Sequence, residues 1–515
     1  MVIRVKTVAF QGIETQSVEV QVQLQSGLPA FNIVGLADKT VAEARERIRA
    51  ALYSMGLAIP AKRITINLAP ADLQKEGTHY DLPMLMGLLA AMEVIPSDSM
   101  DNFLVMGELS LDGQINKVNG VLPSAIHASV LDLGIVCPKS CGAEATWAGD
   151  MCIIAPDNVL GLINHLKGVQ FINRPEISAV FTTEETLCFS DVKGQIVAKR
   201  ALEIVAAGGH NLLMQGPPGA GKSMLASRLP SILPQLSPQE ALEVSMVYSI
   251  AGMLDDKGLV VTRPFREPHH SASLPALVGG GLKARPGEIS LAHNGILFMD
   301  EFPEFSRSSL EAMRQPLETG KITVARANNH VTYPANFQLI AAMNPCKCGY
   351  LGDRTKQCTR APNCGREYMM KLSGPLLDRI DLQLDVPAVS INELNKQNSA
   401  EEASKDVLAR VTLAKDKQHK RYGNAITNAT AKNTVLEDAC ALESDARTLL
   451  VDAANKLQLS ARGYYRVMRV SRTIADLEQS QSVSRRHVCE ALSYRLKLGA
   501  SALETMTATR IGANG

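Results

Sequence analysis

Residues 211–223 have the sequence NLLMQGPPGAGKS, a short apolar strand followed directly by a glycine-rich loop that ends in Lys222 and Ser223. The loop has the full GxxxxGKS spacing, and it lies between a strand and a helix, which is the context that supports a phosphate loop. Glycines let successive backbone N–H groups point inward around phosphate oxygens, and the N-terminus of the next helix assists them. The segment predicts an α/β domain with a parallel sheet that binds a nucleoside triphosphate.

The last two residues of this loop have expected roles. We expect Lys222 to contact the β- and γ-phosphates of ATP and Ser223 to ligate Mg²⁺. The alternative is a Gly-Pro turn with a chance lysine, which the spacing and the context disfavour. The predicted cofactor-binding residues are Gly216, Pro217, Pro218, Gly219, Ala220, Gly221, Lys222, Ser223 and Asp300.

Two further strands are predicted to bring polar groups to the same sheet edge. Residues 296–301, ILFMDE, are four apolar residues followed by Asp300 and Glu301. Acids at the carboxyl end of a buried parallel strand lie where open α/β sheets bind ligands. Asp300 is expected to ligate Mg²⁺, and Glu301 to orient or deprotonate the attacking water. Asn344 ends the strand 338–344 and could contact the water or the γ-phosphate; the alternative is a turn-forming Asn before Pro345.

The composition is that of a globular protein of several domains. The chain has 515 residues, of which 46% are hydrophobic and 20% charged, with a net charge of +1. The near-zero charge excludes a global polycation, so any DNA contact must come from a local basic patch. The longest apolar run, 82–95, is shorter than the roughly 20 residues that span a bilayer. The first residues, MVIRVKTVAFQGIE, have no signal-peptide apolar region. We predict a cytoplasmic protein without a membrane partner.

Hydrophobic patterning divides the chain into four regions. Residues 1–170 mix alternating strands, such as 18–24 and 63–68, with helices at 38–55 and 82–92. The predicted linker is 171–191, the predicted ATPase domain is 192–390, and the largely helical remainder is 391–515. In the last region Val467, Val470, Ile474 and Leu477 share one helical face.

Longer motifs carry a family resemblance. The runs GPPGAGKS, RPFREPHHSAS, ARPGEISLAHNGILFMDE, AAMNPCKCGYLGD and SGPLLDRIDL resemble the magnesium-chelatase-like AAA+ ATPases, and within them the bacterial ComM/YifB group. The resemblance extends over nearly the whole chain. It implies an AAA+ phosphate-loop domain with a helical lid, preceded by an α+β domain like the C-terminal domain of Lon proteases (a ribosomal protein S5 domain 2-like fold). It also implies an ATP-promoted homo-hexamer.

The same resemblance gives roles to two arginines. Arg379, in LLDRID, matches the family's arginine finger, which would reach the γ-phosphate held by a neighbouring subunit. From spacing alone, a surface ion pair with Asp378 or Asp381 is the favoured alternative. Arg462 matches the family's sensor arginine in the lid. If Ser460 caps that helix, Arg462 lies in the first turn, where a cation opposes the helix dipole.

Four of the ten cysteines are close in sequence. Cys346, Cys348, Cys358 and Cys364 form a C-x-C-x9-C-x5-C pattern, which predicts a four-thiolate structural zinc site. The spacing is not that of a standard zinc ribbon, so reduced thiols in a loop near the nucleotide site are the alternative. Adjacent His269 and His270 rarely ligate one metal together, and we expect packing or contact with a DNA backbone.

The resemblance of residues 60–130 to the Lon proteolytic domain does not extend to its chemistry. His79 is at the position of the serine nucleophile, and Pro123 at that of the lysine base. Neither group needed for Ser–Lys acyl transfer is present. We expect an interaction or DNA-binding module without protease activity.

The expected substrate is single-stranded or branched DNA, because the ComM/YifB group is associated with branch migration and helicase activity in recombination and natural transformation. Copies of a local basic patch around a ring could follow a phosphate backbone. The alternatives are a chelatase-type subunit that remodels a protein partner and an ATP switch that does not translocate. The candidate cations are Lys257, Arg263, Arg266, Lys283 and Arg285 on inserts of the ATPase domain, and Lys321 and Arg326 on a predicted hairpin.

Overall fold

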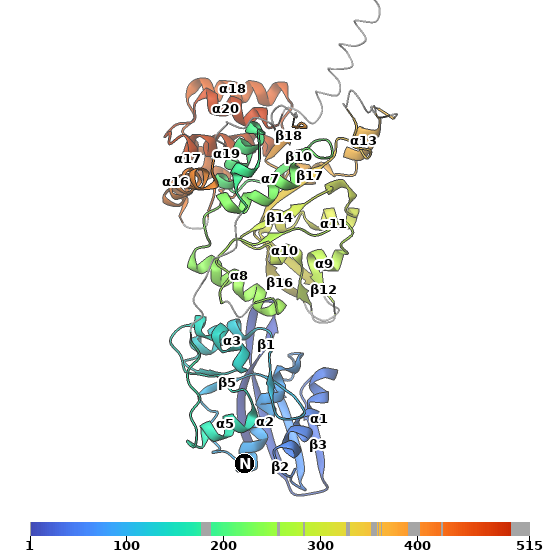
Figure 1. Ribbon diagram of the computed structural model, residues 1–515, viewed down its shortest axis with the longest axis vertical. Helices are drawn as coiled ribbons and strands as arrows, with labels where there is room; N and C mark the ends of the chain where they lie inside the picture. Colours follow the sequence, from blue (N-terminus) through green and yellow to red (C-terminus); the bar gives the residue numbers. More distant parts are fainter. Residues whose placement is uncertain are drawn as a thin grey trace, which may run out of the picture.

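The computed structural model describes residues 2–176, 187–254, 258–281, 284–325, 330–351, 358, 360–361, 363–389, 402–423 and 426–495. Three parts are stacked along the long axis of the molecule (Figure 1). The N-terminal sheet lies at one end, the parallel sheet with the phosphate loop lies in the middle, and the C-terminal helices lie at the other end.

The N-terminal part is built on a seven-stranded mixed sheet with the strand order β3-β4-β2-β1-β5-β8-β9. The pairs β1/β2 and β2/β4 are antiparallel, and the other pairs are parallel. The alternation predicted for 18–24 is confirmed, because Val18, Val20 and Val22 are buried. The strands are β1 (Val2–Gln11), β2 (Glu14–Gln25), β3 (Ala30–Val34), β4 (Arg63–Ala69), β5 (Phe103–Val105), β8 (Gly134–Val136) and β9 (Ile153–Ile154), with a small ribbon of β6 (Glu108–Leu109) and β7 (Ile115–Asn116).

Helices pack on this sheet where the sequence predicts them. The helix expected at 38–55 is α1 (Lys39–Ser54), which Asp38 caps by accepting from the Val41 N–H at 2.7 Å. The apolar helix is α2 (Asp81–Ala91), buried along almost its whole length because sheet and helices surround it. The other helices here are α3 (Val121–Val130), α4 (Gly142–Ala145) and α5 (Val159–Leu166).

The central sheet has five parallel strands in the order β11-β14-β17-β10-β18. Strand β10 precedes the phosphate loop and lies between β17 and β18, so strands that follow it in sequence lie on both of its sides. Such a switch point opens a crevice at the carboxyl ends of the strands. The strands are β10 (Leu212–Gln215), β11 (Phe265–Arg266), β14 (Ile296–Met299), β17 (Gln338–Met343) and β18 (Leu382–Asp385). The parallel α/β domain predicted from the loop is confirmed.

Short helices and two hairpins complete the central part. The antiparallel hairpin of β15 (Lys321–Ala325) and β16 (His330–Pro334) agrees with the hairpin expected around Lys321. The other elements are α6 (Ile196–Gly208), α7 (Lys222–Arg228), α8 (Pro238–Ala251), α9 (Leu274–Val278), β12 (Gly279–Gly280), β13 (Arg285–Pro286), α10 (Glu288–Leu291), α11 (Arg307–Ala312), α12 (Pro316–Thr319), α13 (Asn363–Met369) and α14 (Gly374–Leu377).

The C-terminal helices share their core with the central sheet. One hydrophobic cluster contains residues of β10 and α6 together with Val411, Val467 and Ile474 of the C-terminal helices. The predicted apolar face of α19 is buried, and Phe189, at the end of the predicted linker, packs in the same cluster. The helices are α16 (Ser404–Tyr422), α17 (Asn433–Cys440), α18 (Ser444–Lys456), α19 (Ala461–Leu477) and α20 (Arg485–Ser493).

The N-terminal and central parts meet through α3 and α8. The Gly120 N–H donates to the Ser249 carbonyl at 3.1 Å, and Lys117 Nζ donates to the Leu254 carbonyl at 3.3 Å. Ser249 Oγ donates to Glu144 Oε1 at 2.5 Å, and burial raises the pKa of this glutamate. Backbone, cationic and buried carboxyl groups therefore all take part in the junction. No helix among the described residues is long and apolar enough to cross a bilayer.

Candidate active site

The phosphate loop connects the carboxyl end of β10 to the first residue of α7. Gly219 and Gly221 have φ values of +77° and +87°, a backbone conformation that L side chains rarely adopt. Glycine at these positions therefore lets the loop curl around a phosphate. Strand β17, which pairs with β10, is hydrogen-bonded to the loop, since the Gly216 N–H donates to the Met343 carbonyl at 3.2 Å.

The lysine of the loop is folded back onto its own backbone. Lys222 Nζ donates to the carbonyl oxygens of Gly216 at 2.8 Å and Pro217 at 3.0 Å, and to Asn344 Oδ1 at 3.1 Å. Burial lowers the pKa of Lys222, and the carboxylates of Asp300 and Glu301 oppose that shift. A buried ammonium held by neutral oxygens is well placed to pair with an arriving phosphate.

The two acids at the end of β14 face the loop. Ser223 Oγ donates to Asp300 Oδ2 at 2.7 Å, so a hydroxyl and a carboxylate oxygen lie together as two hard oxygen ligands, the type that Mg²⁺ prefers. Asp300 Oδ1 also accepts from the Glu301 N–H at 2.8 Å, and Glu301 has a positive φ of +50°. This backbone conformation is unusual for a glutamate and separates the directions of the two side chains.

These groups line one cavity of about 370 Å³ at the carboxyl edge of the sheet. The structure therefore brings together the predicted phosphate loop, both acids and Asn344. The lining residues are Pro218, Gly219, Ala220, Gly221, Lys222, Ser223, Met224, Asp300, Glu301 and Asn344. Asn344 follows β17 as predicted, and its contact with Lys222 gives it a role beyond forming a turn.

His270 makes a contact at this site that the sequence did not predict. His270 Nδ1 lies 3.1 Å from Glu301 Oε2, so the ring points to the predicted catalytic acid. The predicted packing is present, since the rings of His269 and His270 lie 4.1 Å apart between centroids, and the contact of His270 with Glu301 was not predicted. Glu267, on the same segment after β11, has its pKa raised by burial and by the Asp300 carboxylate. No spacing rule signals this contact, because it depends on the fold of the loop after β11.

The two predicted arginines do not line the cavity but lie near each other. Arg379 Nη2 donates to Glu318 Oε2 at 2.5 Å, and Arg462 Nη2 lies 3.7 Å from Glu318 Oε1. Ser460 caps α19 as predicted, by accepting from the Gly463 N–H at 3.1 Å. The surface ion pair considered for Arg379 therefore exists, but with Glu318 and not with Asp378 or Asp381.

The sheet direction explains why Arg379 is remote from the phosphate loop. Arg379 precedes β18, and its carbonyl accepts from Asn211 Nδ2 at 3.0 Å, just before β10. This contact lies at the amino edge of a parallel sheet, whereas the cavity lies at the carboxyl edge. A four-residue strand separates the two edges by about 13 Å. Arg379 therefore lies at the edge away from its own chain's nucleotide cavity, with its side chain only 10% exposed.

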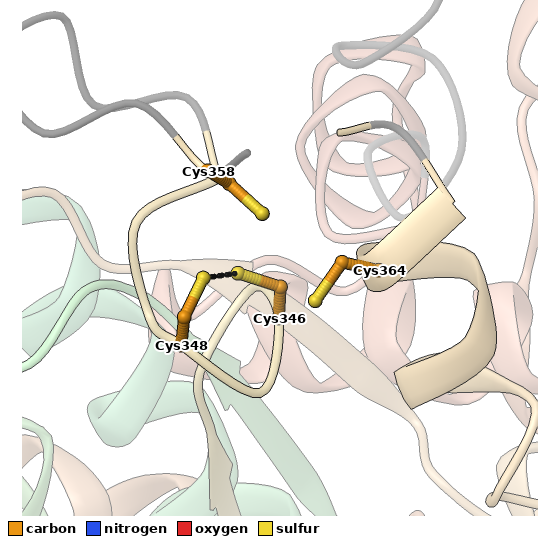
Figure 2. Close-up of side chains that lie close together, drawn as sticks. All are labelled: Cys346, Cys348, Cys358 and Cys364. Carbon is orange, nitrogen blue, oxygen red and sulfur yellow. Dashed lines mark hydrogen bonds between the residues drawn. The ribbon is translucent and has the colours of Figure 1, made fainter. Parts of the chain in front are cut away.

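The four clustered cysteines converge next to the nucleotide site (Figure 2). Their sulfur atoms all lie within 4.8 Å of one another, and Cys346 Sγ and Cys348 Sγ are 3.1 Å apart. Cys346 is fully buried, whereas Cys348 is exposed. A backbone hydrogen bond from Tyr350 and the neighbouring thiols lower the pKa of Cys348 to about 7. The predicted four-thiol cluster is therefore assembled in space.

Comparison with known proteins places this geometry in a family. Three family models match: magnesium chelatase, subunit ChlI, over residues 188–394; subunit ChlI of Mg-chelatase over 19–140; and magnesium chelatase, subunit ChlI C-terminal, over 401–495. The chain is 44% identical to the uncharacterized protein YifB of Escherichia coli over 95% of this chain and 96% of YifB. It is 43% identical to the competence protein ComM of Haemophilus influenzae, with the same coverage of both chains. The chain belongs to the ComM/YifB family of magnesium-chelatase-like proteins.

A more distant relative matches part of the chain. The DNA replication licensing factor mcm6 of Dictyostelium discoideum is 25% identical over 242 residues, which are 47% of this chain and 23% of that protein. The nearly full-length matches to YifB and ComM, and not this partial one, confirm the ComM/YifB family resemblance that the motifs predicted.

Only some of the cations expected to contact DNA are at the surface of this ComM/YifB family chain. Arg263 pairs with Glu240 at 3.1 Å, and Arg266 with Glu288 at 2.7 Å, so both are engaged inside the domain. Arg285 is exposed on β13. Lys321 is exposed at the start of the β15–β16 hairpin. Lys257, Lys283 and Arg326 lie outside the described residues.

His79 and Pro123, which are predicted to occupy the positions of the Lon nucleophile and base, are both buried. His79 is buried, and its Nε2 lies 2.9 Å from the Val8 carbonyl oxygen. Pro123 is buried in the first turn of α3. His79 also lines a cavity of about 320 Å³ between the N-terminal and central parts, to which Lys117 and Arg285 contribute.

Proposed function

We propose that this protein is an ATP-hydrolysing AAA+ motor that works in the cytoplasm as an ATP-promoted homo-hexamer and acts on single-stranded or branched DNA. The single observation that carries the proposal is the cavity in which Lys222, Ser223, Asp300, Glu301 and Asn344 converge. It contains a cation for phosphates, two oxygen ligands for Mg²⁺ and an acid for water. In this reading the α16–α20 helices form the lid of the nucleotide site.

The arrangement of arginines supports a ring. Arg379 and Arg462 are held together by Glu318, at the edge of the sheet opposite the cavity. From that edge, Arg379 would reach a phosphate held by a neighbouring copy and not the phosphate of its own chain. We therefore assign Arg379 to the nucleotide of the next subunit, where it would offset charge on the transferring phosphoryl group, and we assign Arg462 the role of the sensor arginine in the lid. The site is complete only in the assembly.

The proposal for DNA rests on relatives and on one hairpin. One close relative is named a competence protein, and a distant one is named a DNA replication licensing factor. Both names agree with work on DNA, and we propose helicase or branch-migration activity in recombination and natural transformation. The β15–β16 hairpin begins with exposed Lys321 only three residues after Glu318, so DNA at the hairpin could influence the arginines.

The N-terminal part is proposed to be a Lon-C-like domain that serves as an interaction module without protease activity. Resident cofactors would be ATP and Mg²⁺ in the cavity, with a structural Zn²⁺ at the four cysteines. Thiolates are preferred zinc ligands, and four of them close a tetrahedral site without leaving a position for catalysis.

The second candidate function is a chelatase-type subunit that remodels a protein partner, which is favoured by the names of the three matching family models. ATP turnover measured with single-stranded DNA, with a porphyrin and with neither separates the two. Stimulation by DNA and strand displacement from three- and four-stranded substrates are expected. Stimulation by the porphyrin alone would favour the chelatase function, and stimulation by DNA without displacement would indicate a non-translocating switch.

Lys222→Ala is expected to weaken ATP binding by about 10²–10⁴-fold, because the variant loses charge-assisted contacts with two phosphates, each worth about 1.5–3 kcal/mol. Titration with a fluorescent ATP analogue measures the affinity. The control is Lys167→Ala, an exposed lysine after α5 in the N-terminal part. Normal affinity in Lys222→Ala would contradict the assignment of the phosphate loop.

A further inference from the structure

The cysteine cluster has the dimensions of a metal site. Four thiolates at the corners of a tetrahedron around zinc, at about 2.3 Å from the ion, lie about 3.8 Å from one another. The four sulfur atoms here all lie within 4.8 Å of one another, and their side chains point toward a common centre (Figure 2). The distance of 3.1 Å between Cys346 and Cys348 is well beyond a disulfide bond, so both act as free thiols.

The same cluster joins the turn after β17 to the start of α13. Cys346 and Cys348 lie on the turn after β17, and Cys364 lies in the first turn of α13. Cys358 lies between these two elements in the chain. An added Cβ at Gly365, the next residue of α13, would lie 3.2 Å from the Pro345 carbonyl oxygen. The start of α13 is therefore packed directly on the cysteine turn.

This turn in turn lies against the phosphate loop. An added Cβ at Gly349 would lie only 2.7 Å from Cγ of Pro218, so the turn and the loop approach closely. Asn344, two residues before Cys346, accepts the hydrogen bond from Lys222. The cysteine turn thus connects to the nucleotide cavity twice, through Pro218 and through Asn344.

We infer that a zinc ion bound by Cys346, Cys348, Cys358 and Cys364 holds the 344–351 turn against the phosphate loop, so that ATP turnover depends on metal occupancy. The inference rests on the proposed ATPase function and adds a structural requirement to it. Zinc has no redox chemistry of its own, and its four thiolate ligands fill its coordination shell. Its contribution is to fix positions, since small misplacements of groups in an active site lower rates strongly.

Metal content is the first measurement. The purified full-length chain is expected to contain about one zinc ion per chain, and its cobalt-substituted form to show the absorption of a tetrahedral thiolate site. Cys358→Ser and Cys364→Ser should lose the metal. The matched controls Cys152→Ser and Cys489→Ser change exposed cysteines outside the cluster and should keep it. Wild-type protein without metal, or with iron and sulfide in place of zinc, would overturn the inference.

Hydrogen exchange tests the mechanical part without relying on turnover. Metal loss is expected to speed exchange in peptides covering 216–223 and 344–351 and to leave the β1 peptide, Val2–Gln11, unchanged. Unchanged exchange at 216–223 in a zinc-free variant would overturn the inference. Faster exchange along β1 as well would indicate general unfolding and would also count against a local role.

Gly349→Ala separates metal binding from its effect on the nucleotide site. All four ligands remain, so zinc is expected to stay bound, but alanine is strained at the φ of +81° and its methyl group would lie 2.7 Å from Cγ of Pro218, so the turn must shift away from the loop. ATP turnover is expected to fall about 10–10²-fold in this variant and in the two zinc-free variants. Normal turnover in the zinc-free variants would refute the inference while leaving the ATPase proposal standing. Wild-type protein that holds zinc but never binds ATP would refute the ATPase proposal instead.

Discussion

Replacing Arg379 with alanine is expected to lower ATP turnover by about 10³–10⁵-fold, the range found for arginine fingers in other NTPases. ATP affinity should change little, because Arg379 lies at the sheet edge opposite its own cavity. The lost interaction is made mainly in the transition state, when charge develops on the transferring phosphoryl group. Single-turnover hydrolysis together with an ATP-binding titration measures both quantities.

Mixing experiments test whether Arg379 acts on a neighbour. In a ring that hydrolyses ATP at subunit boundaries, each Arg379→Ala chain disables the site of the adjacent chain. Activity should then fall more steeply than the fraction of wild-type chains. Arg447→Ala, which removes an exposed arginine of α18, is the matched control and should leave activity unchanged. A linear decline with mutant fraction would argue for action within one subunit.

Glu301→Gln is expected to keep ATP binding and to slow hydrolysis by about 10²–10⁴-fold, the usual contribution of a positioned general base. The amide keeps the size of the side chain but cannot accept a proton from water. Lys222, Ser223 and Asp300 remain in place, so the binding of nucleotide and Mg²⁺ should persist. Glu311→Gln, on α11 in the same domain, is a control that leaves the cavity intact.

Wild-type turnover in Glu301→Gln would contradict the role assigned to Glu301. If Glu301→Gln retains wild-type turnover, water activation must come from another group at the cavity. The structure offers Asp300 and, through its contact with Glu301, His270. In that case the assignment of Glu301 would be wrong, whereas the assignment of the phosphate loop would still be tested separately by Lys222→Ala.

Elements with a strong local pattern were predicted well. The helix at α1, the alternating strand β2 and the apolar face of α19 all match, because burial on one side imposes a period of 2 or 3.6 on the sequence. The hydrophobic period is weaker in an element that is buried on several sides by other elements. Helix α6, which precedes β10, was not predicted, since α6 packs against both the sheet and the C-terminal helices.

Some residues of the candidate site could likewise be predicted from local patterns, and others could not. Eight consecutive residues make up the phosphate loop, so its chemistry is readable from spacing alone. Asp300, Glu301 and Asn344 were found because parallel strands deliver their final residues to a common edge. Arg263 and Arg266 were assigned to DNA and are instead paired inside the domain, because the sequence does not show which acids they face.

The amino-acid sequence by itself determined the nucleotide-binding loop, the acids opposite it, the four-cysteine pattern and the family, because each depends on residue types at short fixed spacings. Only the tertiary structure decided that His270 faces Glu301, that Glu318 holds Arg379 and Arg462 together, and that the cysteine turn lies on Pro218. Those contacts join segments tens to more than a hundred residues apart. They arise from the order and direction of the strands, which no local spacing encodes.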